Sequence, residues 1–528
     1  MWLEPGRRST YGSGRRRRRS PAVFLVPLVL LAVAGAAVAL FVRNHQRAER
    51  QRAGAERYAR AWTARDAAAM WATLDPASRR AYPLARFKTL LHDADQAATV
   101  TAVRTGAVRD PSGGEIRLPV AVRTRWFGTL RGSVVLPLDD QGHVRWDPHL
   151  RLPGLRRGES PHRKTLRSAH QGRILTSDGH KLANDNALAI FAPGLKKQFA
   201  TRLKGHPGAE LRFGSRRIRR VAPEPGRSIH STMNAALQRV ATAALGSRLG
   251  GVAVLRPSDG SVLALAGIAV SAPQPPGSTF KIITASAALQ TGVATPSSTF
   301  PVQTGATLSG VRLANASDEQ CGGTLVQSFA KSCNSVFAPL GAKVGAKRLM
   351  ARARAFGFGE QPRVPAAKPS TLGTAKDLSD DLAVGSAAIG QNKDLATPLE
   401  MASVAAAIGN DGVRAKPRVV REQQVVKRRA VTRKVAGQVR DMMLAVVRGG
   451  TGTAAALPGV EVAGKTGTAE LRFTGGGTPD PKNTDAWFVA FAPAGDPDVA
   501  VGVMLVGAGA GGAAAAPIAR QVLAAAVG

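Results

Sequence analysis

The sequence predicts a membrane-anchored, multidomain α+β protein, and three observations lead to this fold class. An uncharged apolar run, Pro21 to Val42, is long enough to cross a bilayer as one helix. A helical pattern followed by short strand-like segments fills residues 45–153. Residues 228–528 carry strand-like segments at both ends with helical patterns between them, which predicts a sheet covered by helices.

The strong positive charge does not by itself identify a partner. The chain has 528 residues, enough for two to four domains, and a formal net charge of +38. Such a charge commonly indicates nucleic acid binding, but the apolar run favours an exported protein instead. Outside a cell, lipid headgroups and wall polymers are the anionic partners to expect. An arginine-rich sequence with no anionic target is the alternative that remains open.

The apolar run follows five consecutive arginines, Arg15 to Arg19. The positive-inside rule therefore predicts a cytoplasmic basic tail at 1–20, a transmembrane helix at 21–42 and everything after it outside the cell membrane. A cleaved signal peptide is the alternative, but the run is longer than the usual apolar core of such peptides.

Three regions follow the predicted anchor. Residues 45–153 read as a small α+β domain, with helices up to Asp75-Pro76 and strands from about Thr99. Residues 154–227 are basic, contain a hairpin turn at Asp178-Gly179, and end in a connector rich in Arg, Gly and Pro from Lys196 to Arg227.

Residues 228–528 read as one large domain. It opens with a hairpin around Asp259-Gly260, and its middle includes a helix that Thr397 can cap and Asn410 can stop. Three strand candidates, residues 459–470, 484–493 and 498–507, precede a final Ala-rich helix.

The chemistry begins at the stretch "PPGSTFKII", where Ser278 and Lys281 are three residues apart at the start of a predicted helix. Residues with this spacing share a face of a helix, so the amine can stand beside the hydroxyl. The first turn of a helix also favours negative charge. This is a workable nucleophile and base, but four letters are a weak signal alone.

Two more short motifs follow in order. "SCN" places Ser332 and Asn334 two residues apart, and "KTGT" places Lys465, Thr466, Gly467 and Thr468 on a predicted strand. The bland explanations are a helix cap for the first motif and strand propensity for the second. All three motifs in this order form the set found in penicillin-binding proteins and class A β-lactamases.

On these motifs the chain resembles a class B penicillin-binding protein, a peptidoglycan D,D-transpeptidase. The segments "QGRILTSDGHKLA", "HSTMNAALQ" and "AWFVAFAP" are similar to family segments. The resemblance implies a penicillin-binding domain at 228–528 with an antiparallel sheet, a pedestal or dimerisation-like domain and linker at 154–227, and an NTF2-like domain of the MecA-type subgroup at 45–153. Two departures are "TSDG" in the pedestal and "GQN" at Gly390.

The resemblance also implies roles for these residues. Ser278 is the expected nucleophile, Lys281 its base, Ser332 a proton shuttle and Asn334 a support for Lys281. Lys465 is the expected cation that lowers the pKa of Lys281, and Thr466, Gly467 and Thr468 the expected substrate-binding residues. The N–H groups of Ser278 and Thr468 are the expected oxyanion hole. No cofactor or metal is expected.

The expected activity is cross-linking of stem peptides through a Ser278 acyl-enzyme, with acylation by β-lactams. The expected partners are peptidoglycan stem peptides, the membrane and a polytopic membrane glycan polymerase, because no glycosyltransferase domain fits before residue 228. A D,D-carboxypeptidase of the same fold and a penicillin-binding sensor or scaffold without turnover are the alternatives.

The chain has two cysteines, Cys321 and Cys333, both after the predicted membrane segment. Short spacing and an oxidising compartment favour a disulfide, and two buried free thiols are the alternative.

Overall fold

The computed structural model describes residues 22–167, 170–471 and 480–528, with side chains in the first helix described from residue 33 onward. The chain forms two compact units: Met1–Ser168 with His206–Glu224, and Ala169–Gly205 with Pro225–Gly528. The predicted cytoplasmic tail, residues 1–20, and the first residue of the predicted anchor lie outside the described residues.

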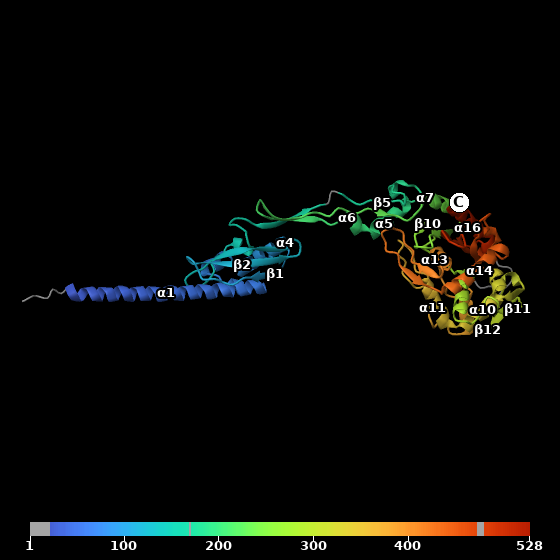
Figure 1. The fold of residues 1–528 in the computed structure, drawn as a ribbon, viewed down its shortest axis with the longest axis horizontal. Helices are drawn as coiled ribbons and strands as arrows, with labels where there is room; N and C mark the ends of the chain where they lie inside the picture. The colour runs from blue at the N-terminus through green and yellow to red at the C-terminus, as the bar shows by residue number, and fades with distance from the viewer. Residues whose placement is uncertain (1–21, 168–169, 472–479) are drawn as a thin grey trace, which may run out of the picture. The chain divides into compact units, whose positions relative to one another are not determined.

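The first unit begins with helices and continues into a sheet, in the order that the sequence predicts (Figure 1). Its helices are α1 (Ala22–Ala64), α2 (Ala67–Ala72), α3 (Pro76–Ala81) and α4 (Leu84–Ala98). Strands β1 (Val100–Thr105), β2 (Glu115–Thr124) and β3 (Thr129–Pro137) form an antiparallel sheet, followed by the short 3-10 turn η1 (Pro148–Arg151). Alternate β2 side chains, including Ile116 and Leu118, are buried, as expected of a sheet with one face on the core.

The first unit has a second sheet, β4 (Pro161–Leu166), β6 (Gly208–Phe213) and β7 (Arg216–Val221), in the order β4-β6-β7. The prediction of a connector from Lys196 to Arg227 was therefore wrong, because this stretch supplies two strands of the sheet. The partner strand β4 lies about forty residues earlier in the chain, so local composition does not reveal the pairing. Leu211 and Phe213 of β6 are buried in the core of the unit.

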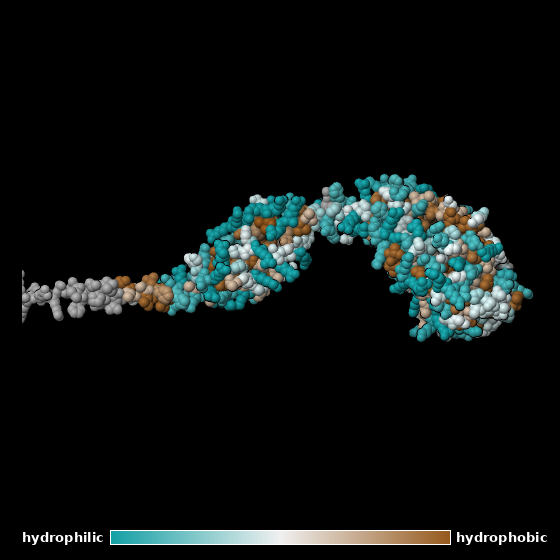
Figure 2. Space-filling model, in the orientation of Figure 1, coloured by the Kyte–Doolittle hydropathy of each residue, from teal (hydrophilic) through white to brown (hydrophobic). Residues whose placement is uncertain are grey.

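Apolar side chains of α1 are exposed near the start of the described chain. Val33, Val38, Leu40 and Phe41 are each more than half exposed, and Figure 2 shows a brown band beside the grey atoms. Within the described residues, however, no helix satisfies both the length and the apolarity needed to cross a membrane.

The second unit is built on a five-stranded antiparallel sheet. Its order is β10 (Val262–Gly267), β9 (Gly250–Leu255), β19 (Val499–Leu505), β18 (Thr484–Ala492) and β17 (Ala463–Glu470). The hairpin at the start of the domain and the three closing strands are thus confirmed. The strand with the "KTGT" motif, β17, is at one edge of this sheet.

Helices cover both faces of the sheet. On one face, α7 (Ala235–Leu245) packs on β9 and β10 and α16 (Ala516–Val527) packs on β18 and β19, in one core with Val252 and Val254 of β9. On the other, α13 (Pro398–Gly409) and the helix after Ser278, α8 (Lys281–Gln290), share a core with Ala253 and Leu255. Because both faces are buried, these strands read as continuous apolar runs. Thr397 caps α13 as predicted, by accepting from the Glu400 N–H at 3.1 Å.

The remaining elements surround this sandwich. Before the sheet these are β5 (Ile174–Leu175), η2 (Leu182–Asn184), η3 (Ala189–Phe191), α5 (Ala192–Gln198), α6 (Ala200–Lys204) and β8 (Ile229–His230). Between β10 and β17 the chain forms η4 (Gly277–Phe280), β11 (Thr299–Gln303), β12 (Gly305–Leu308), β13 (Val311–Ala314), η5 (Ala316–Asp318), β14 (Cys321–Thr324), α9 (Leu325–Ala330), α10 (Asn334–Val344), α11 (Ala346–Phe356), α12 (Asp381–Ala388), β15 (Val413–Ala415), β16 (Lys427–Arg429), α14 (Arg433–Gly449) and η6 (Thr453–Ala455). The last two are η7 (Pro481–Asn483) and α15 (Gly511–Ala514).

Candidate active site

Ser278 lies on the 3-10 turn η4, and Lys281 is the first residue of α8. The sequence predicts one helix from Ser278, and the structure replaces its first turn with the tighter one. Ser278 is half-buried and lines a cleft of about 990 Å³ together with Ser332 and Asn334. Lys281 is fully buried and is hydrogen-bonded to the last two of these residues.

The turn that carries Ser278 packs unusually closely on its neighbours, which explains the glycine before the serine. Gly277 has φ +52°, and a Cβ there would lie 2.9 Å from the Thr468 carbonyl oxygen. On the other side, the Gly277 N–H donates to Gly390 O at 3.0 Å. A side chain at Gly277 would push η4 away from β17.

Lys281 is held by two residues of the "SCN" motif. Its Nζ donates to Ser332 O and to Asn334 Oδ1, both at 2.7 Å, and lies 3.3 Å from Ser332 Oγ. Burial, and then the nearby charge of Lys465, lower the pKa of Lys281 well below its usual value. If the amine is neutral, the two close acceptors take both of its N–H bonds, and its lone pair is left for a hydroxyl hydrogen.

Lys465 approaches the same serine from the edge strand β17. Its Nζ donates to Ser332 Oγ at 2.8 Å and to Thr466 O at 3.1 Å. Burial lowers the pKa of Lys465 to about 7. The sequence predicts Lys465 as the nearby cation that lowers the pKa of Lys281, and in the structure its charge acts in that direction after the larger effect of burial.

Ser332 and Asn334 do not cap the helix that follows them, so helix capping does not explain this motif. The residue at the N-cap position of α10 is Cys333, and it makes no side-chain cap hydrogen bond. Ser332 has φ +64°, a conformation that non-glycine residues seldom adopt. Asn334 donates through Nδ2 to Ala314 O at 2.7 Å, which leaves Oδ1 for Lys281.

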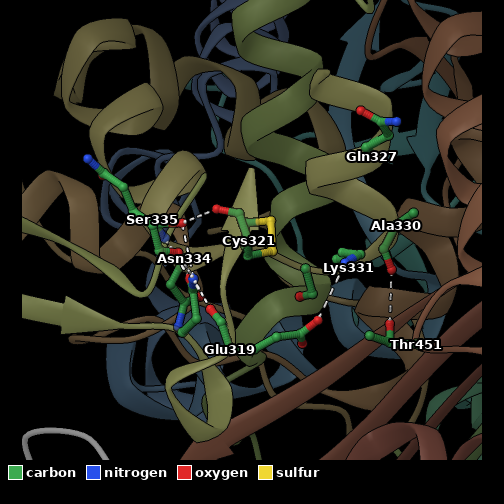
Figure 3. The surroundings of a disulfide bond; sticks show 12 residues. Glu319, Cys321, Gln327, Ala330, Lys331, Asn334, Ser335 and Thr451 are labelled. Atoms are coloured by element: carbon green, nitrogen blue, oxygen red, sulfur yellow. Dashed lines mark hydrogen bonds and ion pairs between the residues drawn. A yellow bond between two sulfur atoms is a disulfide. The ribbon is translucent and has the colours of Figure 1, made fainter. Parts of the chain in front are cut away.

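Cys321 and Cys333 are joined by a disulfide, with Cα atoms 5.5 Å apart. Figure 3 shows the disulfide beside Asn334 and Ser335, with Lys331 and Glu319 near the same loop. Because Cys333 lies between Ser332 and Asn334, the bond ties the motif to β14.

Thr466 and Thr468 line the cleft together with Ser278, Ser332 and Asn334. Thr466 Oγ1 lies 2.5 Å from Thr451 Oγ1, and Thr468 Oγ1 accepts from the Gly511 N–H at 3.4 Å. The structure therefore brings the side chains of all three sequence motifs to one place, with Lys281 and Lys465 buried behind it and Gly467 between the two threonines.

Sequence reasoning missed several residues of this cleft. Thr451 and Thr453 line it from the segment after α14, and the carboxylates of Glu319, Asp377 and Asp380 line it from other loops. The signal for Thr451 was the "GGTGT" run close before the "KTGT" strand, where two short hydroxyl-rich stretches share one edge of the domain.

Comparison with known proteins agrees with this geometry. The family model for the penicillin binding protein transpeptidase domain matches residues 250–524, more than half of the chain. The chain belongs to this family. The sequence-based resemblance to a penicillin-binding protein is thereby confirmed, including a fold with an antiparallel sheet and covering helices.

This chain is 39% identical over 290 residues to a curated relative, peptidoglycan D,D-transpeptidase PbpA of Mycolicibacterium smegmatis. The match covers 49% of this chain and 56% of that one. It is 37% identical over 300 residues to PbpA of Mycobacterium tuberculosis, covering 52% of this chain and 59% of that one. The chain thus spans a little over half the length of these relatives.

Among solved structures, penicillin-binding protein A from M. tuberculosis as its penicillin G acyl-enzyme complex superposes with a TM-score of 0.57 at 29% identity, covering 68% of this chain and all of that one (100%). The D,D-transpeptidase domain of a peptidoglycan glycosyltransferase from Eggerthella lenta gives the same TM-score, 0.57, at 29% identity, covering 68% of this chain and 98% of that one.

Proposed function

We propose that this protein is a monofunctional serine-type D,D-transpeptidase that cross-links peptidoglycan stem peptides and is acylated by β-lactams. The observation that carries the proposal is that Ser278 shares its cleft with Ser332 and Asn334, the two residues that accept from the fully buried Lys281 Nζ at 2.7 Å. The family match and the relatives named as D,D-transpeptidases support the same reaction.

In the first half of the reaction, Ser278 Oγ attacks the carbonyl of the penultimate D-alanine, and Lys281 Nζ takes the hydroxyl proton. The peptide C–N bond then breaks, and the departing D-alanine amine receives a proton through Ser332. The Ser332 hydroxyl suits this role because it lies between the two lysine amines, 3.3 Å from Lys281 Nζ and 2.8 Å from Lys465 Nζ.

In the second half, an amine from a neighbouring stem attacks the Ser278 ester, a new amide bond forms and Ser278 regains its proton. We assign the oxyanion hole to the N–H groups of Ser278 and Thr468, whose turn and strand pack closely at Gly277. Lys465, Thr466 and Thr468 suit the terminal carboxylate of the donor stem, because a charged amine and two hydroxyls are donors that carboxylates accept.

The test is labelling of the purified protein with a fluorescent penicillin, followed by peptide mapping. Label on the peptide that contains Ser278, and none on the Ser278→Ala variant, is the expected result. The absence of label at any dose would favour a scaffold. Release of D-alanine without any cross-linked product, when a donor stem and an acceptor amine are both supplied, would favour the D,D-carboxypeptidase.

We further propose that the apolar run at 21–42 anchors the protein in the cell membrane, with the basic tail cytoplasmic and the catalytic unit outside. The arginines before the run and its length support this orientation. N-terminal sequencing of the mature protein should find the arginines retained. A mature chain that starts near Ala39 or later would indicate a cleaved signal peptide instead.

We also propose an NTF2-like domain at 45–153 and a pedestal at 154–227. The helix-then-sheet order of the first unit supports the NTF2-like domain.

We propose as well that a polytopic membrane glycan polymerase supplies the glycan strands. Co-purification of the full chain with such a polymerase from membranes tests this partnership. A chain recovered alone under mild detergent would argue against the partnership.

A further inference from the structure

The Asn334 amide is oriented by a backbone carbonyl of another segment. A carbonyl oxygen can only accept, so Ala314 O, at 2.7 Å, requires the Nδ2 end of the amide. The Oδ1 end therefore faces Lys281 Nζ, also at 2.7 Å. The contact that Lys281 receives thus depends on where the end of β13 holds Ala314.

The residue after Ala314 is Asn315, and its buried side chain makes three close hydrogen bonds. Its Nδ2 donates one hydrogen each to Gln303 O and Glu319 O, both at 2.8 Å, and lies 3.2 Å from Ser335 Oγ. Its Oδ1 accepts from the Ser335 N–H at 2.8 Å. With an exposed fraction of 4%, Asn315 has every side-chain polar atom committed inside the protein.

These contacts connect the two chain segments that lie on either side of the Asn334 amide. One segment is β13, since Asn315 is the chain neighbour of Ala314. The other is the first turn of α10, since Ser335 is the chain neighbour of Asn334. Ser335 Oγ also donates to Cys321 O at 3.2 Å, which connects these segments to β14, the strand that carries the disulfide (Figure 3).

We propose that Asn315 is a positioning residue for acylation, which fixes the Asn334 amide against Lys281 by holding Ala314 and Ser335 at a set separation. The inference rests on the proposed function of Ser278 and Lys281. Asn315 lines the same cleft as Ser278, but both of its side-chain polar atoms are hydrogen-bonded within the protein, so its effect should pass through Asn334.

Loss of Asn315 should leave the Asn334 amide free to turn or withdraw. Lys281 would then lose one of the two acceptors that direct its lone pair. Misplacement of a catalytic group by about 1 Å can cost ~10²-fold in rate. We therefore expect Asn315→Leu, which keeps the volume and removes the hydrogen bonds, to slow acylation by roughly 10- to 10²-fold.

The experiment is a double-mutant cycle on the full chain, read as the single-turnover rate constant of acylation by a fluorescent penicillin. Asn315→Leu is measured in the wild-type and Asn334→Ala backgrounds. With the probe in excess, a permanently inactive fraction of the sample lowers the amplitude of labelling and not the single-turnover rate constant. Asn234→Ala, which removes the cap of α7 away from the cleft, is the matched control for a loss of stability alone.

The expected result is a large slowing by Asn315→Leu in the wild-type background and less than ~2-fold in the Asn334→Ala background, with no slowing by Asn234→Ala. If Asn315→Leu does not fold, Ser335→Ala removes the Oγ contacts, keeps the backbone contact, and should show a smaller slowing with the same dependence on Asn334. Equal slowing in both backgrounds would overturn the inference. A wild-type protein that takes no label at Ser278 would instead overturn the proposed function.

Discussion

Lys281 and Lys465 carry the same amine, but their surroundings suit them to different tasks. Lys281 is buried among acceptors with a strongly lowered pKa, whereas Lys465 has a pKa of about 7 and points its Nζ at Ser332 Oγ. Lys281→Arg creates a permanently protonated group, so acylation should fall by at least ~10²-fold. Lys465→Arg keeps the charge and should only reduce the rate. The second-order acylation rates of the two variants with a labelled penicillin test this, and similar rates would exclude Lys281 as the base.

The pKa of Lys465 also predicts the pH dependence of acylation. Because Lys465 loses its proton as the pH rises through about 7, binding of a carboxylate-bearing probe should weaken on the alkaline side. Loss of a proton from Lys281 would make it a better base and raise the rate, so an alkaline decline should belong to Lys465. Lys465→Arg should lack the decline, since an arginine stays charged. The acylation rate measured from pH 5 to pH 10 decides, and an unchanged alkaline decline in the variant would refute this origin.

Thr451 should assist the carboxylate site through Thr466. Its hydroxyl lies 2.5 Å from Thr466 Oγ1 and lines the cleft. Thr451→Val keeps the shape and removes the hydroxyl, so acylation by a penicillin with a free carboxylate should slow by roughly 2- to 10-fold. A penicillin methyl ester should be affected much less. Thr453→Val, in the same cleft, is the control, and equal slowing of both probes would contradict a role in carboxylate binding.

For single residues, the sequence predicted side chains that the structure brings together at the cleft, and it missed their supports. Acyl transfer needs particular residue types in a particular order, which is why the sequence could suggest Ser278, Lys281, Ser332, Asn334 and Lys465. Ala314 acts through its backbone carbonyl, which every residue has, so no pattern could reveal it. The role of Gly277 depends on the approach of β17, which is distant in the chain.

At the scale of elements, the disulfide links β14 to the residue before α10. Replacing both cysteines, Cys321→Ala with Cys333→Ala, should lower the free energy of unfolding by ~3 kcal/mol, because the disulfide no longer closes this loop in the unfolded chain. Acylation should slow as well, since Ser332 and Asn334 flank Cys333. Thermal melting and thiol titration of the denatured, unreduced protein provide the test. Two free thiols in the wild-type protein, or an unchanged melting temperature in the variant, would contradict it.

Elements were predictable where pairing is local or the pattern is long. The hairpin β9–β10 follows from its turn residues, and the strands β18 and β19 follow from their apolar runs. Strands β6 and β7 were missed because "RRIRRV" in β7 has one apolar side chain before its final valine and pairs in a sheet completed by distant β4. The 3-10 turn at Ser278 reflects tertiary packing around Gly277, which overrides helix propensity.

At the scale of the molecule, the chain passes between the two units more than once. The predicted boundary at residue 228 therefore cuts through the packing of the second unit. Four leucines before it, Leu182, Leu188, Leu195 and Leu203, are buried in the same core as Phe280 and Ile283. Residues before 228 also make polar contacts with residues after it. Gln198 donates to Arg363 O at 3.1 Å, and β5 pairs with β8.

A fragment that starts at residue 228 should therefore be less stable than one that starts at residue 169. Each buried leucine side chain contributes about 1.5–3 kcal/mol, so losing all four removes a large share of a typical domain's stability. The longer fragment keeps these residues, although β6 and β7 lose β4. We expect the fragment 169–528 to melt cooperatively and to be acylated at Ser278, and the fragment 228–528 to melt at a lower temperature or aggregate. Equal melting temperatures and acylation rates would mean that residues 169–205 do not support the core, and that the boundary at 228 describes a true domain.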